Sequence, residues 1–212
     1  MTQSIQRITQ KDTNYPIRLE QYLKTETPET IWARGNIDLL PGQNATLNGD
    51  LWALFCSSKC PGEIILKAHD LAQEFRNAGI PTIGGYHSPV EQECLRVLLR
   101  GSQPILLCPA RSIENMRLKP AWKDSLTEKR LLILSIFGEH HRRSTAVLAN
   151  QRNAFVAALA DKICIAHAAA DSKILEFAQM VVSWGNLYSL LRHRQTMYFF
   201  NLGRDGLNRP EV

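Results

Sequence analysis

The chain has 212 residues, which suits one well-packed core and excludes two domains of the usual size. A formal net charge of +5 permits an anionic partner without proving one, and five dispersed cysteines indicate reduced thiols in the cytoplasm rather than a disulfide framework. The sequence has neither an apolar leader nor the roughly 18-residue apolar run of a membrane span, so we expect no membrane partner.

The first 45 residues are predicted to form an extension packed on the core. Residues 1–14 are polar and are expected to be loosely held. Apolar positions between residues 17 and 23 fit a short helix or turn. Thr27-Pro28-Glu29 predicts the start of a helix that buries Ile31 and Trp32, because threonine suits the cap and proline the first turn.

Five short apolar runs predict strands that are buried on both faces, at residues 51–56, 80–83, 104–108, 131–137 and 163–167. A helix follows the first run and ends at Gly79, and another opens with the capping box Ser88-Pro89-Val90-Glu91. A third helix runs from about Ser144 to about Ala160, whereas residues 109–124 form a longer connection. This alternation predicts an α/β fold with a doubly wound, mostly parallel sheet over residues 46–191 and helices on both faces.

Residues 174–182 predict a last helix, for which Ser172 is a candidate cap. An edge strand is expected at 187–191. The tail, residues 192–212, contains Tyr198-Phe199-Phe200, which is too apolar for free coil.

Ligands of doubly wound sheets bind outside the carboxyl ends of the strands. Those ends carry small residues, hydroxyl groups and cations here, and free N–H groups at helix starts favour anions. A plain turn explains residues 56–62 equally well, because neither a dinucleotide fingerprint nor a P-loop is present. The candidate phosphate-binding residues at this edge are Ser57, Ser58, Lys59, Gly84, Gly85, His87, Arg111, Arg143 and Ser172.

Arg152 lies inside the apolar sector of its predicted helix, next to Asn153. A buried guanidinium needs an anionic or carbonyl partner, so an internal ion pair and a ligand-facing role stay open at equal weight. Four histidines, at 87, 140, 141 and 167, share the edge, but no nucleophile elbow, zinc-binding pair of histidines or carboxylate dyad accompanies them. Cys56 and Cys60 lack a second ligand pair, so we expect no metal site. Because no reaction centre accompanies the histidines, we also expect no catalysis and no cofactor.

A pattern of motifs begins with Tyr15-Pro16, continues through Gly35-Asn36 and the stretch 79–85, and is most specific at Arg152-Asn153 followed by residues 157–161. In order and spacing it resembles the DNA-processing protein A (DprA/Smf) family over about residues 15–185. The resemblance implies a Rossmann-like homodimer that binds single-stranded DNA without catalysis and loads a RecA-type recombinase during transformation or recombination. It places DNA on Ser57 to Lys59, on Gly84, Gly85 and His87, and on Arg152 and Asn153.

The sequence also departs from the family pattern, since Cys56-Ser57-Ser58-Lys59 replaces a Gly-Ser/Thr-Arg turn and Ala154 replaces a second arginine. One alternative is a nucleotide sensor or nucleoside-monophosphate phosphoribohydrolase of the related lysine-decarboxylase-like (LOG) branch. That branch is expected to show Pro-Gly-Gly-x-Gly-Thr-x-x-Glu, of which residues 84–91 keep two glycines and Glu91. A purely structural partner-binding relative is the third alternative.

Overall fold

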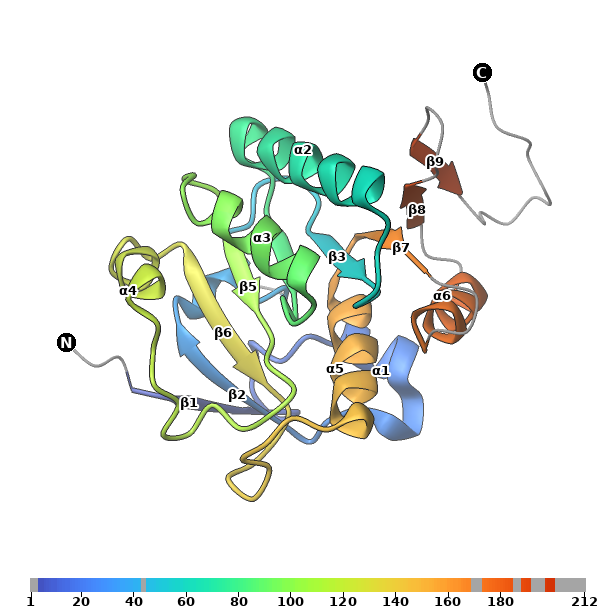
Figure 1. The fold of residues 1–212 in the computed structure, drawn as a ribbon. Helices are drawn as coiled ribbons and strands as arrows, with labels where there is room; N and C mark the ends of the chain where they lie inside the picture. Colours follow the sequence, from blue (N-terminus) through green and yellow to red (C-terminus); the bar gives the residue numbers. More distant parts are fainter. Residues whose placement is uncertain (1–3, 43–44, 169–172, 185–187, 192–196, 201–212) are drawn as a thin grey trace.

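The computed structural model describes residues 4–42, 45–168, 173–184, 188–191 and 197–200 (Figure 1). The strands are β1 (Gln6–Thr9), β2 (Thr30–Gly35), β3 (Trp52–Cys56), β4 (Thr82–Gly84), β5 (Ile105–Leu107), β6 (Leu131–Ser135), β7 (Lys162–His167), β8 (Tyr188–Leu191) and β9 (Met197–Phe200). The helices are α1 (Arg18–Leu23), α2 (Gly62–Ala78), α3 (Pro89–Leu98), α4 (Pro120–Thr127), α5 (Ala146–Leu159) and α6 (Lys173–Ser183), with single 3-10 turns η1 (Lys24–Glu26) and η2 (Ile37–Leu39).

The described strands form one sheet in the order β1-β2-β6-β5-β4-β3-β7-β8-β9. From β6 to β8 every neighbouring pair is parallel. The outer strands β1, β2 and β9 run antiparallel to their neighbours. The predicted doubly wound, mostly parallel sheet is therefore confirmed.

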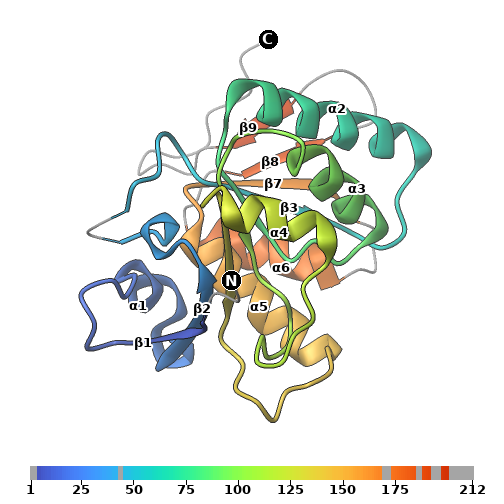
Figure 2. The same cartoon turned by 90° about the vertical axis from the view of Figure 1, so that its left-hand side faces the viewer.

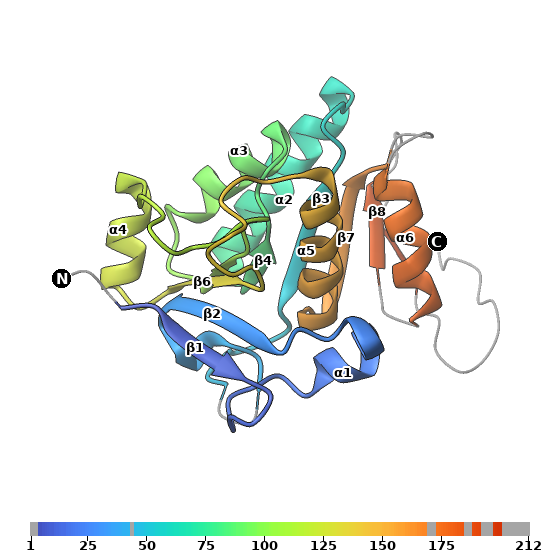
Figure 3. The same cartoon turned by 90° about the horizontal axis from the view of Figure 1, so that it is seen from below.

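Helices cover both faces of the sheet. α2, α3 and α4 lie on one face, whereas α1, α5 and α6 lie on the other (Figures 2 and 3). Along β3, Ala53 and Phe55 belong to the core of the α5 face, whereas Trp52 and Leu54 belong to the core of the α2 face. This alternation explains why the run is apolar throughout, since both faces of a parallel strand are buried.

Local capping signals place most helix ends where the sequence predicts them. Gly79 closes α2 in the left-handed conformation with φ = 71°. Ser88 and Glu91 form both hydrogen bonds of the predicted capping box. The cap of α5 is Thr145 and not the adjacent Ser144, because the hydroxyl group of Thr145 accepts the N–H of Leu148.

Two expectations for the N-terminal region are wrong. Residues after Thr27 form strand β2 and not a helix, because pairing with the buried β6 satisfies the backbone from Trp32 to Gly35. The Thr-Pro-Glu signal is local, and a tertiary partner overrides it. Residues 6–9 are not loosely held, since they pair with β2 as β1 and bury Ile8.

The connection at 109–124 also contains the start of α4.

The C-terminal part extends the sheet beyond β7. The strand predicted at residues 187–191 is confirmed as β8, which pairs with β7. Its predicted place at the edge of the sheet is wrong, because β9, which contains Tyr198 to Phe200, pairs with its other side. The division at residues 45/46 and 191/192 stays a proposal. Among the residues that the structure describes, none of the helices has the length and apolar character that crossing a membrane requires.

Candidate functional site

The six described parallel strands, β3 to β8, bring their carboxyl ends to one edge of the sheet. In Figure 1, β5 and β6 point downward to this edge, and the 138–145 loop lies beneath them. Because β3, β4, β5 and β6 are parallel neighbours, the loops that follow them share this edge. The structure thus brings together the following predicted residues: Ser57, Ser58, Lys59, Gly84, Gly85, His87, Arg111 and Arg143.

The strand order reverses beside β3, which pairs with β4 on one side and with β7 on the other. The register shifts at Cys56, the last residue of β3, and the next backbone N–H, that of Ser57, donates to the carbonyl oxygen of His167 at 3.0 Å. Such a reversal leaves a crevice at the strand ends, which is where doubly wound sheets bind ligands. The loop Ser57 to Lys59 follows β3 at this reversal.

Glu91 holds two of the edge loops together. One carboxylate oxygen accepts the backbone N–H of Cys56 at 2.9 Å, and the other accepts those of His87 at 2.7 Å and Ser88 at 3.2 Å. The side chain is 7% exposed. The sequence predicted its capping role, which is confirmed, but not its bond to β3, because that bond joins residues far apart in the chain.

Arg152 is the second organising group, and it is 5% exposed. Its Nη1 atom donates to the carbonyl oxygen of Cys108 at 3.0 Å, and its Nε donates to Oδ1 of Asn153 at 2.8 Å. Among the described residues, the predicted need for a partner is met by a carbonyl and an amide. Burial lowers the pKa of Arg152, and the charge of nearby Glu91 opposes that shift.

The guanidinium of Arg152 occupies the space that a side chain at Gly85 would need. A Cβ atom on Gly85 would lie 1.1 Å from Nη1 of Arg152. Glycine is therefore required here by a close approach of two elements. Arg152 joins the loops after β4 and β5 to α5, so its position sets the shape of the edge.

Exposed groups line the outer side of this framework. Ser58, Lys59, His87 and Arg143 are exposed, and Arg111 is partly exposed. The loops after β5 and β6 are linked, because the N–H of Ser112 donates to the carbonyl oxygen of His141 at 2.8 Å. Cations above a frame of small residues and backbone N–H groups can hold phosphate groups. A contact between DNA and any of these residues stays a prediction, and Ser172 lies outside the described residues.

The thiols at this edge are poor candidates for nucleophiles. Burial raises the pKa of the Cys108 thiol to about 12, although the Arg152 charge opposes that shift. Burial also raises the pKa of Cys56, so both thiols are protonated at neutral pH. Within the described part of the chain, no cluster of three or more His, Cys, Asp and Glu side chains could hold a metal ion.

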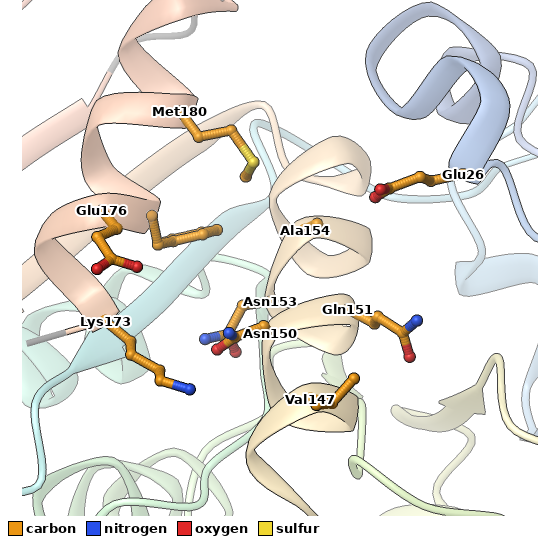
Figure 4. Close-up of a pocket in the computed structure, with 10 residues that line it drawn as sticks. Glu26, Val147, Asn150, Gln151, Asn153, Ala154, Lys173, Glu176 and Met180 are labelled. Atoms are coloured by element: carbon orange, nitrogen blue, oxygen red, sulfur yellow. The ribbon is translucent and has the colours of Figure 1, made fainter.

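A groove next to this edge was not predicted from the sequence. It has a volume of about 350 Å³ and runs over the outer face of α5, between α6 and η1 (Figure 4). Its lining includes Asn150, Asn153, Lys173, Glu176 and Phe177. The polar residues of α5 alone do not predict a groove, because α6 and η1 form its walls. We call it the α5 groove.

Comparisons with known proteins connect this architecture to DNA metabolism. The family model described as DNA recombination-mediator protein A matches residues 6–190. The chain is similar to the structure of DNA processing protein A (DprA) from Streptococcus pneumoniae, with a TM-score of 0.68 and 18% identity over 89% of this chain and 63% of that one. It thus spans less than two thirds of the pneumococcal protein.

A second similar structure is DNA processing protein A from Helicobacter pylori, with a TM-score of 0.68 and 17% identity over 93% of this chain and 86% of that one. That structure is described as giving insights into a unique single-stranded DNA binding mode. At these identities the two structures show a shared fold. None of the curated proteins matches the sequence.

Proposed function

The chain belongs to the DNA recombination-mediator protein A family, and we propose that it binds single-stranded DNA along the carboxyl edge of its sheet without catalysis. The observation that carries this proposal is the convergence of small, cationic loops on a frame held by Glu91 and Arg152. The described binding mode of the Helicobacter pylori relative supports the choice of ligand. Phosphate groups supply the negative charge that such loops attract.

We assign different roles to the cations of this edge. Lys59, Arg111 and Arg143 reach solvent and contact phosphates, because a charge must be accessible to meet the backbone of DNA. Arg152 is buried, so it positions the loops that carry these contacts. Gly85 leaves room for the guanidinium of Arg152, whereas the exposed Ser58 is the small residue that lets the DNA backbone approach closely. Gly84 and Ser57 are buried, so they shape the loops instead of contacting DNA.

The absence of catalysis is part of the proposal. Glu91 is the one acidic residue that the chain shares with the LOG pattern, and its two carboxylate oxygens already accept backbone N–H groups. A carboxylate committed in this way is poorly placed to activate water. We expect incubation with adenosine monophosphate to release no ribose phosphate, and release of ribose phosphate would support the alternative hydrolase.

The family description as a recombination mediator supports a RecA-type recombinase as a partner. We also propose a homodimer, which the family resemblance of the sequence implies. Light scattering during gel filtration is expected to give the mass of a homodimer. A monomer at the concentrations used for DNA binding would contradict the dimer.

If the recombinase contact exists, the protein should speed the assembly of the recombinase on single-stranded DNA that is coated with a single-strand-binding protein.

Removing an edge cation should weaken DNA binding. We expect Lys59→Ala and Arg143→Ala each to reduce the affinity for a dT oligonucleotide about threefold to tenfold at low salt. The reason is that each of the two replaced side chains neutralises about one phosphate group in the unaltered protein. Fluorescence anisotropy of the labelled oligonucleotide measures this change. Arg100→Ala is the matched control, since Arg100 is exposed and lies before β5, at the opposite edge of the sheet.

The comparison with Arg100 separates a local site from general attraction to a basic protein. We expect the Arg100→Ala variant to bind within about twofold of the unaltered protein. Equal losses for Arg100→Ala and Arg143→Ala would show that net charge, and not the carboxyl edge, governs binding.

A further inference from the structure

The α5 groove differs in charge from the edge that it adjoins. Its lining includes one cation, Lys173, and two carboxylates, Glu26 and Glu176. The loops after β3, β5 and β6 instead present Lys59, Arg111 and Arg143. A phosphate group is therefore attracted to the edge and not to the groove, whereas a neutral polar group suits the groove.

Carboxamide groups provide most of the hydrogen-bonding capacity of the α5 groove. Figure 4 shows Asn150 and Asn153 on the part of α5 that faces Lys173 of α6. They are three residues apart on the helix and thus lie on adjacent turns. An amide presents a donor and an acceptor side by side, which matches the edge of a nucleobase.

Arg152 orients one of these amides. Its Nε donates to Oδ1 of Asn153 at 2.8 Å, so the oxygen of this amide is occupied and its NH₂ group is left as the donor. Asn153 is 9% exposed, which restricts its rotation. The groove thus combines a fixed donor at Asn153, an acceptor-only carboxylate at Glu176 and the adaptable amide of Asn150.

Phe177 gives the groove an apolar wall. Its ring packs against Phe55 with centroids 4.6 Å apart, so the ring is held in place from β3. The volume of about 350 Å³ lies in the range of small-ligand pockets and accommodates one base rather than a run of nucleotides. α5 and α6 both begin at the carboxyl edge, so a base can enter the groove while its phosphates stay on the loops.

We propose that the α5 groove binds one unstacked adenine of the single strand whose phosphates lie on the edge loops. This inference rests on the proposed DNA-binding function. Adenine offers an amino donor and ring-nitrogen acceptors without a carbonyl oxygen. Thymine, guanine and cytosine each carry a carbonyl oxygen, which the carboxylates of Glu26 and Glu176 disfavour.

The test compares two labelled oligonucleotides of about twelve nucleotides, one all-dT and one with a single central dA in the same context. Fluorescence anisotropy of the full chain is expected to show about tenfold tighter binding of the dA-containing strand. In Asn150→Ala the ratio of the two affinities should fall to about one. Asn77→Ala, the same change on the exposed end of α2, should keep the ratio near ten.

The outcomes separate this inference from the function on which it rests. Salt-sensitive binding without preference for dA, or a preference that Asn150→Ala leaves intact, would overturn the adenine site while the proposed function stands. Failure of both oligonucleotides to bind at low salt would overturn both proposals. Loss of the preference only in Asn150→Ala would support the adenine site.

Discussion

Replacing Glu91 with alanine is expected to lower the free energy of unfolding by about 3–5 kcal/mol. The substitution leaves the N–H groups of Cys56, His87 and Ser88 without their acceptor in a buried setting. It also removes one half of the capping box of α3 and a negative charge close to the buried Arg152. Urea unfolding followed by circular dichroism measures the loss.

Two further variants identify the cause of that loss. Glu93→Ala on the same helix should cost less than about 1 kcal/mol, because Glu93 is exposed and makes a surface pair with Arg96. Glu91→Gln keeps one oxygen acceptor and should fall between the unaltered protein and Glu91→Ala. If Glu91→Ala proved no more harmful than Glu93→Ala, the carboxylate would not hold the edge loops together.

Gly85→Ala is expected to cost about 2–4 kcal/mol, because the added Cβ atom displaces the guanidinium of Arg152. The same substitution should cost less than about 1 kcal/mol in a chain that already carries Arg152→Ala. This coupling follows because the nearest obstacle to the methyl group is then absent. The free energies of unfolding of the two single variants and the double variant give the coupling directly.

Gly62→Ala provides the control for this cycle. A Cβ atom at Gly62, the first residue of α2, would meet nothing within 4 Å, so its replacement should be neutral or slightly stabilising. Additive costs for Gly85→Ala and Arg152→Ala would contradict the packing of Arg152 over Gly85. Gly85→Ala should also weaken DNA binding, since the loop after β4 must move.

The parts of the fold that could be predicted depend on short-range patterns. Apolar runs located β3, β5 and β6, and glycine and serine signals located the end of α2 and the start of α3. The strand β2 could not be predicted, because its partner β6 follows about a hundred residues later and decides its conformation. The Thr27-Pro28-Glu29 pattern is a valid local signal that this distant pairing overrides.

The candidate site could also be predicted only in part, from the same short-range patterns. Carboxyl-end loops could be predicted from strand order, and helical periodicity placed Arg152 inside the protein. Its partners, the Cys108 carbonyl and the Asn153 amide, depend on how α5 packs across the sheet. The α5 groove depends on three elements, so neither Lys173 nor Phe177 carried a signal that would join them to Asn150.

The salt dependence of binding to single-stranded DNA is the decisive test for a phosphate-binding edge. The logarithm of the association constant for a dT oligonucleotide should fall linearly with the logarithm of salt concentration, with a slope of about −2. This value follows because single strands contribute about −0.7 per phosphate neutralised and three accessible cations make contacts. No binding at low salt, or binding that does not change with salt, would contradict a phosphate-binding edge.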